Sequence, residues 1–198
     1  MGEILFINMR ELGKNQFEDR KMLIQEGTVA GVYFLEESLK RTFIEKLKDE
    51  LAVLNGVSEK EHHIEYKNID LIPEDKINSS LSCQEYVYMY CMIRRGFNNM
   101  LEERFEQILR QLNLGFLKEK KVGELGEGFQ VLVRCIAAYL VGIQLLVFQN
   151  EIRFWETGEK EAFWTFLDYF KRNNGIGLLV STRKEQLEEL ADVVYEIV

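Results

Sequence analysis

Residues 27–47 read GTVAGVYFLEESLKRTFIEKL, a strand-like run followed by the start of an amphipathic helix. The first eight residues are mostly apolar and rich in β-branched side chains, which is typical of a strand buried on both faces of a sheet. After a break, apolar side chains recur at helical spacing as far as Leu54, and Gly56 is expected to end the helix. A strand that leads directly into a helix can direct backbone N–H groups at a phosphate. The stretch therefore predicts an α/β fold with a candidate phosphate site in the connection.

The connection, residues 34–42, matches only part of the phosphate loop GxxxxGK[ST] of nucleotide-binding proteins. Lys40 and Thr42 are in register with that loop, and Arg41 lies between them. The glycines are missing, and three other residues stand in their places: Phe34, Glu37 and Leu39. Glycine is used there because the backbone must take positive φ and approach the phosphate closely. The connection is therefore predicted to be too crowded for a triphosphate.

Negative charge also disfavours a triphosphate in this connection, because Glu36 and Glu37 would direct carboxylates at the phosphate position. Two like charges about 4 Å apart at an effective dielectric near 20 repel by roughly 4 kcal/mol, on the order of a thousandfold in affinity. A Lys-x-Thr sequence at this point is also common in an ordinary, solvated first turn of a helix. Both interpretations of residues 40–42 stay open at this point.

Composition limits the class of protein. With 198 residues, 46% hydrophobic and 29% charged, the chain is long enough for a globular domain with its own core. A net charge of −8 argues against general nucleic-acid binding. Three cysteines without metal spacing, no evident signal peptide and no long apolar run favour a cytoplasmic protein.

The remaining elements follow from local patterns along the chain. Residues 4–8 and 22–24 flank a polar turn and predict a small antiparallel pair. Ser82 with Glu85, and Asn99 with Glu102, predict the starts of two helices that form a helical subdomain at about residues 80–122. From residue 122 onward, helical patterns alternate with the apolar runs LLVF, IGLLVS and VVYEIV, which predicts a mainly parallel sheet with flanking helices.

The order of these parts resembles the ATP-binding cassette, the nucleotide-binding subunit of ABC transporters, over nearly the whole chain. Residues 120–151, KKVGELGEGFQVLVRCIAAYLVGIQLLVFQNE, are similar to the family's segment that runs from LSGGQ to an Asp-Glu pair. Residues 161–197 resemble its closing run, including an LLVST strand that a histidine normally follows. IPEDK, residues 72–76, stands where the family has its glutamine loop, which brings Glu74 to the site. The resemblance implies a single cassette domain, residues 1–198, with a P-loop NTPase-like fold into which the helical subdomain is inserted.

The resemblance also implies where catalytic groups should lie, and there the chain departs from the family. The Asp-Glu pair and the histidine correspond to Gln149, Asn150 and Arg183. Gln149 has no charge to hold Mg²⁺, and the amide of Asn150 cannot accept a proton at neutral pH. Arg183 could still contact a phosphate. We therefore expect no catalytic residues and no metal site.

The signature segment and its neighbours differ as well. The segment Leu125, Gly126, Glu127 and Gly128 stands in place of Leu-Ser-Gly-Gly, so the Glu127 carboxylate would face the γ-phosphate of a partner cassette. Glu156 takes the place of the aspartate in the short loop that touches the partner. No aromatic residue occurs at 11–13 to stack on adenine, and Phe17 is the candidate substitute. Together these changes are typical of a cassette that has lost its ATPase activity.

The expected function is that of a degenerate ABC transporter ATP-binding subunit, a structural or regulatory cassette on a membrane permease. It would lie in the cytoplasm, peripheral on the inner face of the cell membrane, and could pair with an active sister cassette or with itself. No cofactor is expected, although ATP with Mg²⁺ remains an alternative. One alternative is a weak NTPase that uses Lys40, Thr42 and Arg183 with Glu74 or Glu151 as base. Another is a free-standing anion or nucleotide sensor.

The predicted contact with the permease is the helical segment 82–115. It contains an aromatic run that could stack bases, but the acidic chain favours a role in the core and the interface: Tyr86, Tyr88, Tyr90 and Phe97. His62 and His63 have no carboxylate or cysteine at a metal-binding interval and are expected on the surface. No nucleic-acid partner is expected.

Overall fold

The computed structural model describes residues 4–8, 21–54, 69–73, 75–95, 100–149 and 152–197. These residues form two compact units, each treated separately below. The sheet unit takes in residues 1–71, 144–150 and 171–198, and the helical unit takes in residues 72–143 and 151–170. Several predictions concern residues outside the described ranges, among them those on Gly56, His62, His63, Phe97 and Asn99.

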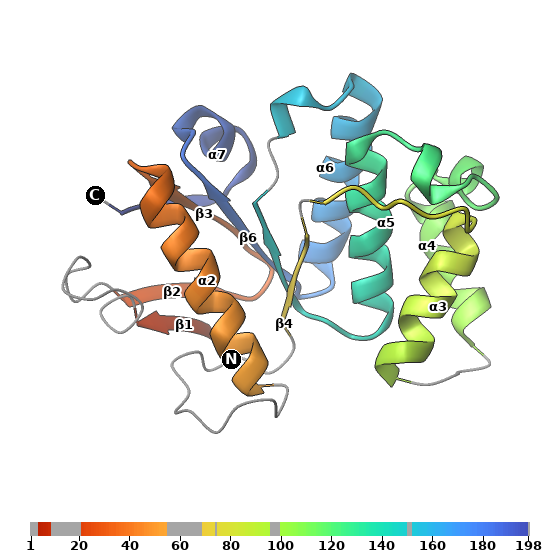
Figure 1. Cartoon of the computed structure of the whole chain (residues 1–198), viewed down its shortest axis with the longest axis horizontal. Helices are drawn as coiled ribbons and strands as arrows, with labels where there is room; N and C mark the ends of the chain where they lie inside the picture. The colour runs from red at the N-terminus through yellow and green to blue at the C-terminus, as the bar shows by residue number, and fades with distance from the viewer. Residues whose placement is uncertain are drawn as a thin grey trace. The chain divides into compact units, whose positions relative to one another are not determined.

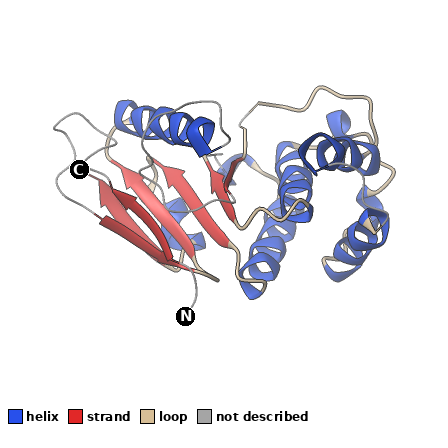
Figure 2. Ribbon diagram, turned by 90° about the horizontal axis from the view of Figure 1, so that it is seen from below, coloured by secondary structure: helices blue, strands red, loops and turns tan. Residues whose placement is uncertain are grey.

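Five parallel strands form the main sheet of the sheet unit, in the order β4-β5-β6-β3-β7. Their bounds are β3 Val29–Phe34, β4 Ile69–Leu71, β5 Leu145–Phe148, β6 Ile176–Ser181 and β7 Val193–Ile197. Strands β5 and β6 are buried along their whole length, and β3 at all but one position, as expected where helices cover both faces. The arrows of these strands point the same way in Figure 2. The predicted mainly parallel α/β sheet is confirmed.

A second, two-stranded ladder joins β1 (Ile4–Asn8) to β2 (Lys21–Gln25) in antiparallel register. Met22 and Ile24 of β2 are buried in the same core as β3. Alternate residues of a strand point to the same face, so these two side chains fix which face of the ladder is covered. The small antiparallel part predicted for residues 4–8 and 22–24 is therefore present.

Helix α2 (Glu37–Leu54) carries the chain from β3 towards β4, and Figure 1 shows it lying across the strands of its own unit. Phe43, Ile44 and Leu47 are buried at helical spacing and belong to the core cluster of the sheet. The ring of Phe43 contacts that of Phe34 at the end of β3, with centroids 5.2 Å apart. The apolar residues whose spacing predicted this helix are therefore the ones that pack it against the sheet.

Helix α7 (Lys184–Leu190) connects β6 to β7 and packs closely against β3. A side chain at Gly31 would place its Cβ 3.0 Å from Cβ of Leu187, which is shorter than an ordinary contact. The glycine in the middle of β3 is therefore required by the close approach of a helix rather than by a turn.

The helical unit contains α3, α4, α5 and all but the last two residues of α6, together with three short 3₁₀ turns. The bounds are α3 Cys83–Arg95, α4 Leu101–Gln111, α5 Glu127–Leu140, α6 Thr157–Arg172, η1 Gly115–Leu117, η2 Val122–Glu124 and η3 Ile152–Phe154. The capping box of α3 is confirmed, because Glu85 N–H donates to Ser82 Oγ and Ser82 N–H donates to Glu85 Oε2. The N-cap of α4 is Met100, without a side-chain cap, one residue later than the predicted start at Asn99.

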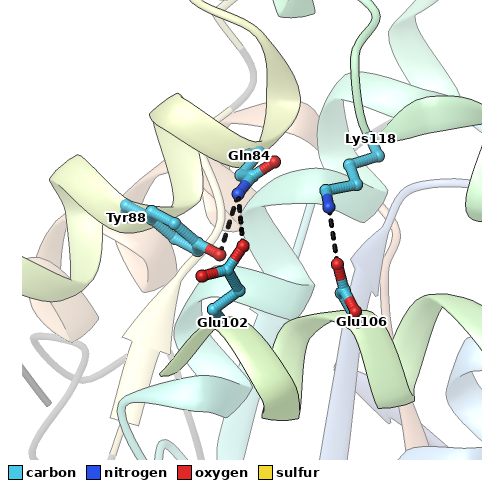
Figure 3. Close-up of polar contacts among 5 residues, drawn as sticks. All are labelled: Gln84, Tyr88, Glu102, Glu106 and Lys118. Atoms are coloured by element: carbon cyan, nitrogen blue, oxygen red, sulfur yellow. Dashed lines mark hydrogen bonds and ion pairs between the residues drawn. The ribbon is translucent and has the colours of Figure 1, made fainter. Parts of the chain in front are cut away.

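Polar contacts hold α3, α4 and the segment after η1 together (Figure 3). Gln84 Nε2 donates to the hydroxyl of Tyr88 (3.0 Å) and to Oε1 of Glu102 (3.4 Å). Lys118 Nζ donates to Oε1 of Glu106 (2.6 Å), which lowers the pKa of that carboxyl and raises the pKa of the lysine. Burial raises the pKa of Tyr88 above its ordinary value. These contacts join α3 to α4, and the segment after η1 to α4.

The sequence predicts a helical subdomain at about residues 80–122, and that segment lies wholly within the helical unit. The unit is larger because α5 packs against α3 and α4. The predicted boundaries, and the description of the chain as a single cassette domain, stay predictions. None of the helices in the described ranges has the length and apolar character needed to cross a membrane.

Candidate functional site

The topology of the parallel sheet indicates where a ligand would bind. The connection after β3 leads to β4 at one edge of the sheet, whereas the connection after β6 leads to β7, on the other side of β3. In open α/β sheets, ligands bind beyond the carboxyl ends of the strands where two such connections diverge. The candidate site is therefore the edge of the sheet at the ends of β3 and β6.

The connection from β3 to α2 is very short, because only Leu35 and Glu36 lie between the strand and the helix. Phe34, at the first expected glycine position, is fully buried against Phe43. The described segment 34–40 contains none of the residues with positive φ, so Glu37 and Leu39 lie in ordinary backbone conformations. Helix α2 thus begins at positions where a phosphate loop would still have non-helical backbone wrapped around the phosphate.

Lys40 is 9% exposed, and its Nζ lies 3.2 Å from Oε1 of Glu37, one turn earlier on α2. Its backbone N–H donates to the carbonyl of Glu36 (3.2 Å) in an ordinary helical hydrogen bond. Arg41 Nε lies 3.7 Å from the same Glu37 oxygen, on a side chain that is 76% exposed. The lysine that would bind a phosphate is therefore already paired with a carboxylate of the chain itself.

The hydroxyl groups of this turn also have partners within it. Thr42 Oγ1 donates to the carbonyl of Ser38 (3.0 Å), and Ser38 Oγ donates to Oε2 of Glu36 (3.0 Å). Carboxylates at a helix N-terminus are stabilised by the helix dipole, as a phosphate would be. Glu36 and Glu37 thus supply negative charge where a nucleotide-binding protein would take it from its ligand.

Two other predicted site residues lie at the same edge of the sheet. Gln149 follows β5 directly and is half-buried, and Arg183 precedes α7, where its N–H donates to Ser181 Oγ (3.0 Å). Because the strands are parallel, their ends bring both residues to the edge that carries the β3–α2 connection. Asn150, Glu151 and Glu74 lie outside the described residues, as do Phe17 and residues 11–13.

The signature-like segment belongs to the helical unit and ends at the first turn of α5. Leu125 and Glu127 are half-buried, Gly126 is the exposed N-cap and Gly128 is buried. Glu159, from the first turn of α6, is 4% exposed and accepts hydrogen bonds from the backbone N–H of Glu156 (2.9 Å) and of Phe129 (3.4 Å). Glu159 is not among the site residues predicted from the sequence, although its place three residues after Glu156, the residue before α6, is typical of a capping box.

A second interaction that the sequence analysis missed fixes the segment after β4 to α5. The Arg134 guanidinium donates to the carbonyl of Pro73 (2.6 Å) and to that of Asp75, one on each side of position 74. Gln130 accepts from Ile77 N–H (2.7 Å) and donates to the carbonyl of Leu125 (3.0 Å). One face of α5 therefore holds the glutamine-loop segment and the signature-like segment at the same time.

The described residues at this edge include no cluster of metal ligands, and the cysteines are buried elsewhere in the chain. Within the described ranges, no group of three or more His, Cys, Asp or Glu residues could hold a metal ion. The three cysteines, Cys83, Cys91 and Cys135, are buried in the helical unit and free of disulfides. Burial raises the pKa of the Cys83 and Cys91 thiols to about 11, which keeps both protonated at neutral pH.

The predicted partner surface on α3 is only partly aromatic. Tyr86, Tyr88 and Tyr90 are half-buried rather than enclosed in the core. The most exposed apolar side chains of this helix are instead Met89, Met92 and Ile93, the last of which is 76% exposed. The exposed surface of α3 thus has more aliphatic character than the aromatic run suggests.

Comparison with known proteins identifies the fold of this chain. No protein-family model and no curated protein matches the sequence. The chain is similar to a solved structure of a proposed metal-chelate type ABC transporter in an inward-facing conformation, with 16% identity, a TM-score of 0.75, and coverage of 100% of this chain and 80% of that one. It is also similar to a nucleotide-free ATP-binding cassette from an ABC transporter, with 15% identity, a TM-score of 0.72 and coverage of 100% and 88%.

A third similar structure is cbiO1 from Clostridium perfringens, part of the ABC transporter complex cbiONQ. Its identity is 14%, its TM-score 0.69, and the match covers 100% of this chain and 85% of that one. At these identities the likeness establishes a fold. The chain has the P-loop NTPase-like fold of ABC transporter ATP-binding cassettes, as the sequence predicted.

Proposed function

We propose that this chain is a degenerate ATP-binding cassette that does not hydrolyse ATP and acts as a structural or regulatory subunit on a membrane permease. The observation that carries the proposal is the ion pair between Lys40 and Glu37 in a connection that is already helical from residue 37. A nucleotide would have to displace the Glu37 carboxylate from the lysine and approach the backbone past the fixed ring of Phe34. Both requirements disfavour binding.

The chemistry of the neighbouring positions supports the same conclusion. The Thr42 hydroxyl, the one in register with a phosphate loop, already donates to the carbonyl of Ser38 within its own helix. Gln149 and Asn150 offer neutral amides, which neither balance the charge of a divalent cation nor take a proton from water. Arg183 keeps the capacity to contact an anion, but a single guanidinium does not position an attacking water.

The partner we propose is an integral membrane permease, which would place the chain in the cytoplasm on the inner face of the membrane. Support comes from the fold, which is that of proteins described as parts of ABC transporters. Exposed aliphatic side chains on α3, such as Met92 and Ile93, provide an apolar surface of the kind that protein interfaces use. A sister cassette or a second copy of this chain is the further partner in this proposal.

Nucleotide binding and turnover test the first half of the proposal. Isothermal titration of the purified chain with Mg·ATP should show no binding up to millimolar concentration, and hydrolysis should be the same in the wild type and in Lys40→Ala. Arg41→Ala serves as the control, since it removes an exposed cation from the same turn. Turnover that disappears only in Lys40→Ala would establish the alternative, a weak NTPase, and reject the proposal.

Photo-crosslinking in the native cell tests the second half. A crosslinking amino acid at Ile93 of α3 should join the chain to an integral membrane protein, whereas one at the exposed Lys48 of α2 should not. Products that form only with soluble proteins at both positions would show that the chain is a free-standing protein instead.

A further inference from the structure

Glu159 is a buried carboxylate whose two oxygens cap two different helices. Oε2 accepts the N–H of Glu156, the residue before α6, which is half of an ordinary capping box. Oε1 accepts the N–H of Phe129, the third residue of α5. Gly126, the N-cap of α5, has no side chain for this task. Helix α5 therefore receives its N-terminal acceptor from another helix of the same unit.

The two glycines of the signature-like segment make room for this carboxylate. A Cβ on Gly126 would overlap Oε1 of Glu159. A Cβ on Gly128 would lie 2.7 Å from Cβ of Glu159 and 2.9 Å from the ring of Trp155. The volume next to the first turn of α5 is thus filled by a charged group that belongs to the chain.

Glu159 excludes an external anion from the start of α5 by its charge as well as by its volume. The N-terminus of a helix attracts anions through its free N–H groups and its dipole, and here a carboxylate already uses both. A second anion held about 4 Å from this carboxylate would lose on the order of a thousandfold in affinity. An external phosphate is therefore disfavoured at the start of α5 as long as Glu159 stays in place.

We propose that Glu159 is a built-in substitute for a phosphate at the N-terminus of α5, and that it closes segment 125–128 to a nucleotide held by a partner subunit. This inference rests on the proposed function and deepens it: the chain would associate with a partner cassette without completing that partner's nucleotide site. The sequence predicts that Glu127 supplies the obstructing charge, but the buried carboxylate at α5 is that of Glu159.

The inference predicts that an external anion can replace the missing carboxylate. In Glu159→Ala, the melting temperature should fall by roughly 2–8 °C, because the cap of α5 and half of the capping box of α6 are lost. Inorganic phosphate should then raise the melting temperature of this variant more than sodium chloride of equal ionic strength does. The wild type and Glu161→Ala, which removes an exposed carboxylate of the same helix, should show no such difference.

Two further variants identify the site and guard against a failure to fold. The effect of phosphate should persist in Glu159→Ala combined with Lys40→Ala; if it disappears there, the anion binds at Lys40 and the inference is wrong. Glu159→Gln keeps the volume and one acceptor but loses the charge, so it should fold, melt below the wild type and show no phosphate effect. A Glu159→Gln protein as stable as the wild type would overturn the inference.

The two proposals can fail separately. If the wild type binds Mg·ATP through Lys40 while phosphate still rescues Glu159→Ala in the Lys40→Ala background, the proposed function is wrong and the role of Glu159 stands. If ATP does not bind and phosphate stabilises the wild type and Glu159→Ala equally, the proposed function stands and the role of Glu159 is rejected.

Discussion

Glu37 Oε1 lies 3.2 Å from Lys40 Nζ, so the lysine that the sequence predicts to contact a phosphate is paired with the residue predicted to stand at a glycine position. The pair lies within one helical turn, where residues three apart are neighbours. Glu37 is half exposed, so solvent screens the attraction and limits its effect on stability. The ion pair mainly affects ligand binding, because the Glu37 carboxylate neutralises the Lys40 charge that would attract a phosphate.

Glu37→Ala should release Lys40 without creating a nucleotide site. We expect the free energy of unfolding to change by only about 0.2–1 kcal/mol, measured by urea denaturation, because the pair is partly solvated. Titration with Mg·ATP should still give no binding, since the helical backbone of residues 37–40 remains. Strong binding by this variant would show that charge alone had closed the site.

Phe34→Gly should be costly, although it restores a glycine that phosphate loops use. The ring is fully buried against Phe43, and loss of a buried Phe side chain costs about 3–5 kcal/mol. Leu35→Gly is the matched control, because Leu35 is adjacent and 60% exposed; we expect it to cost about 1 kcal/mol. Equal losses of stability in the two variants would contradict the assignment of Phe34 to the core.

Gly128→Ala should destabilise the helical unit, although alanine is ordinarily the better helix residue. Its Cβ would meet Cβ of Glu159 and the ring of Trp155, neither of which can swing away, so we expect a loss of about 1–3 kcal/mol. Gly158→Ala, in the first turn of α6, has open space around the new methyl group and should instead gain about 0.4–1 kcal/mol. Chemical denaturation of both variants tests this difference in sign.

The elements of the fold were predictable because their signals are local. The apolar run before residue 34, the helical spacing after it and the capping box at Ser82 each depend on neighbours within a few positions. The short β3–α2 connection was harder, because Lys40 fits both a phosphate loop and an ordinary helical turn. Only the backbone distinguishes the two.

The contacts that define the site were not predictable from local patterns. Arg134 reaches Pro73 across 61 positions, and Glu159 reaches Phe129 across 30. Arginine is common within helices, and glutamate is common in their first turns. The type and position of these two residues therefore do not reveal which distant groups they contact. Such long-range polar contacts become visible only when the helices are packed.

The ion pair between Glu106 and Lys118 predicts a dependence on pH. The hydrogen bond from Lys118 lowers the pKa of Glu106, so its stabilising effect is present above the ordinary carboxyl pKa and is lost as pH falls through the lowered value. The raised pKa of Lys118 has the opposite consequence at high pH, where the effect is lost as pH rises through it. In Lys118→Gln, an NMR titration should find Glu106 titrating at higher pH than in the wild type. Lys120→Gln, which removes a nearby exposed lysine, should leave that titration unchanged.

The buried thiols offer a direct probe of the helical unit. Burial raises the pKa of Cys83 and Cys91 from 9.0 to about 11, so at pH 8 the thiolate form is about a hundredfold scarcer than in an exposed cysteine. An aromatic disulfide reagent should therefore react slowly with the native chain and rapidly with all three cysteines in urea. Because the unfolded thiols lose their protons first, stability should fall as pH rises from about 9 towards 11. Rapid reaction of Cys83 or Cys91 in the native protein would mean that α3 is open to solvent, and that its packing against α5 is weaker than the structure indicates.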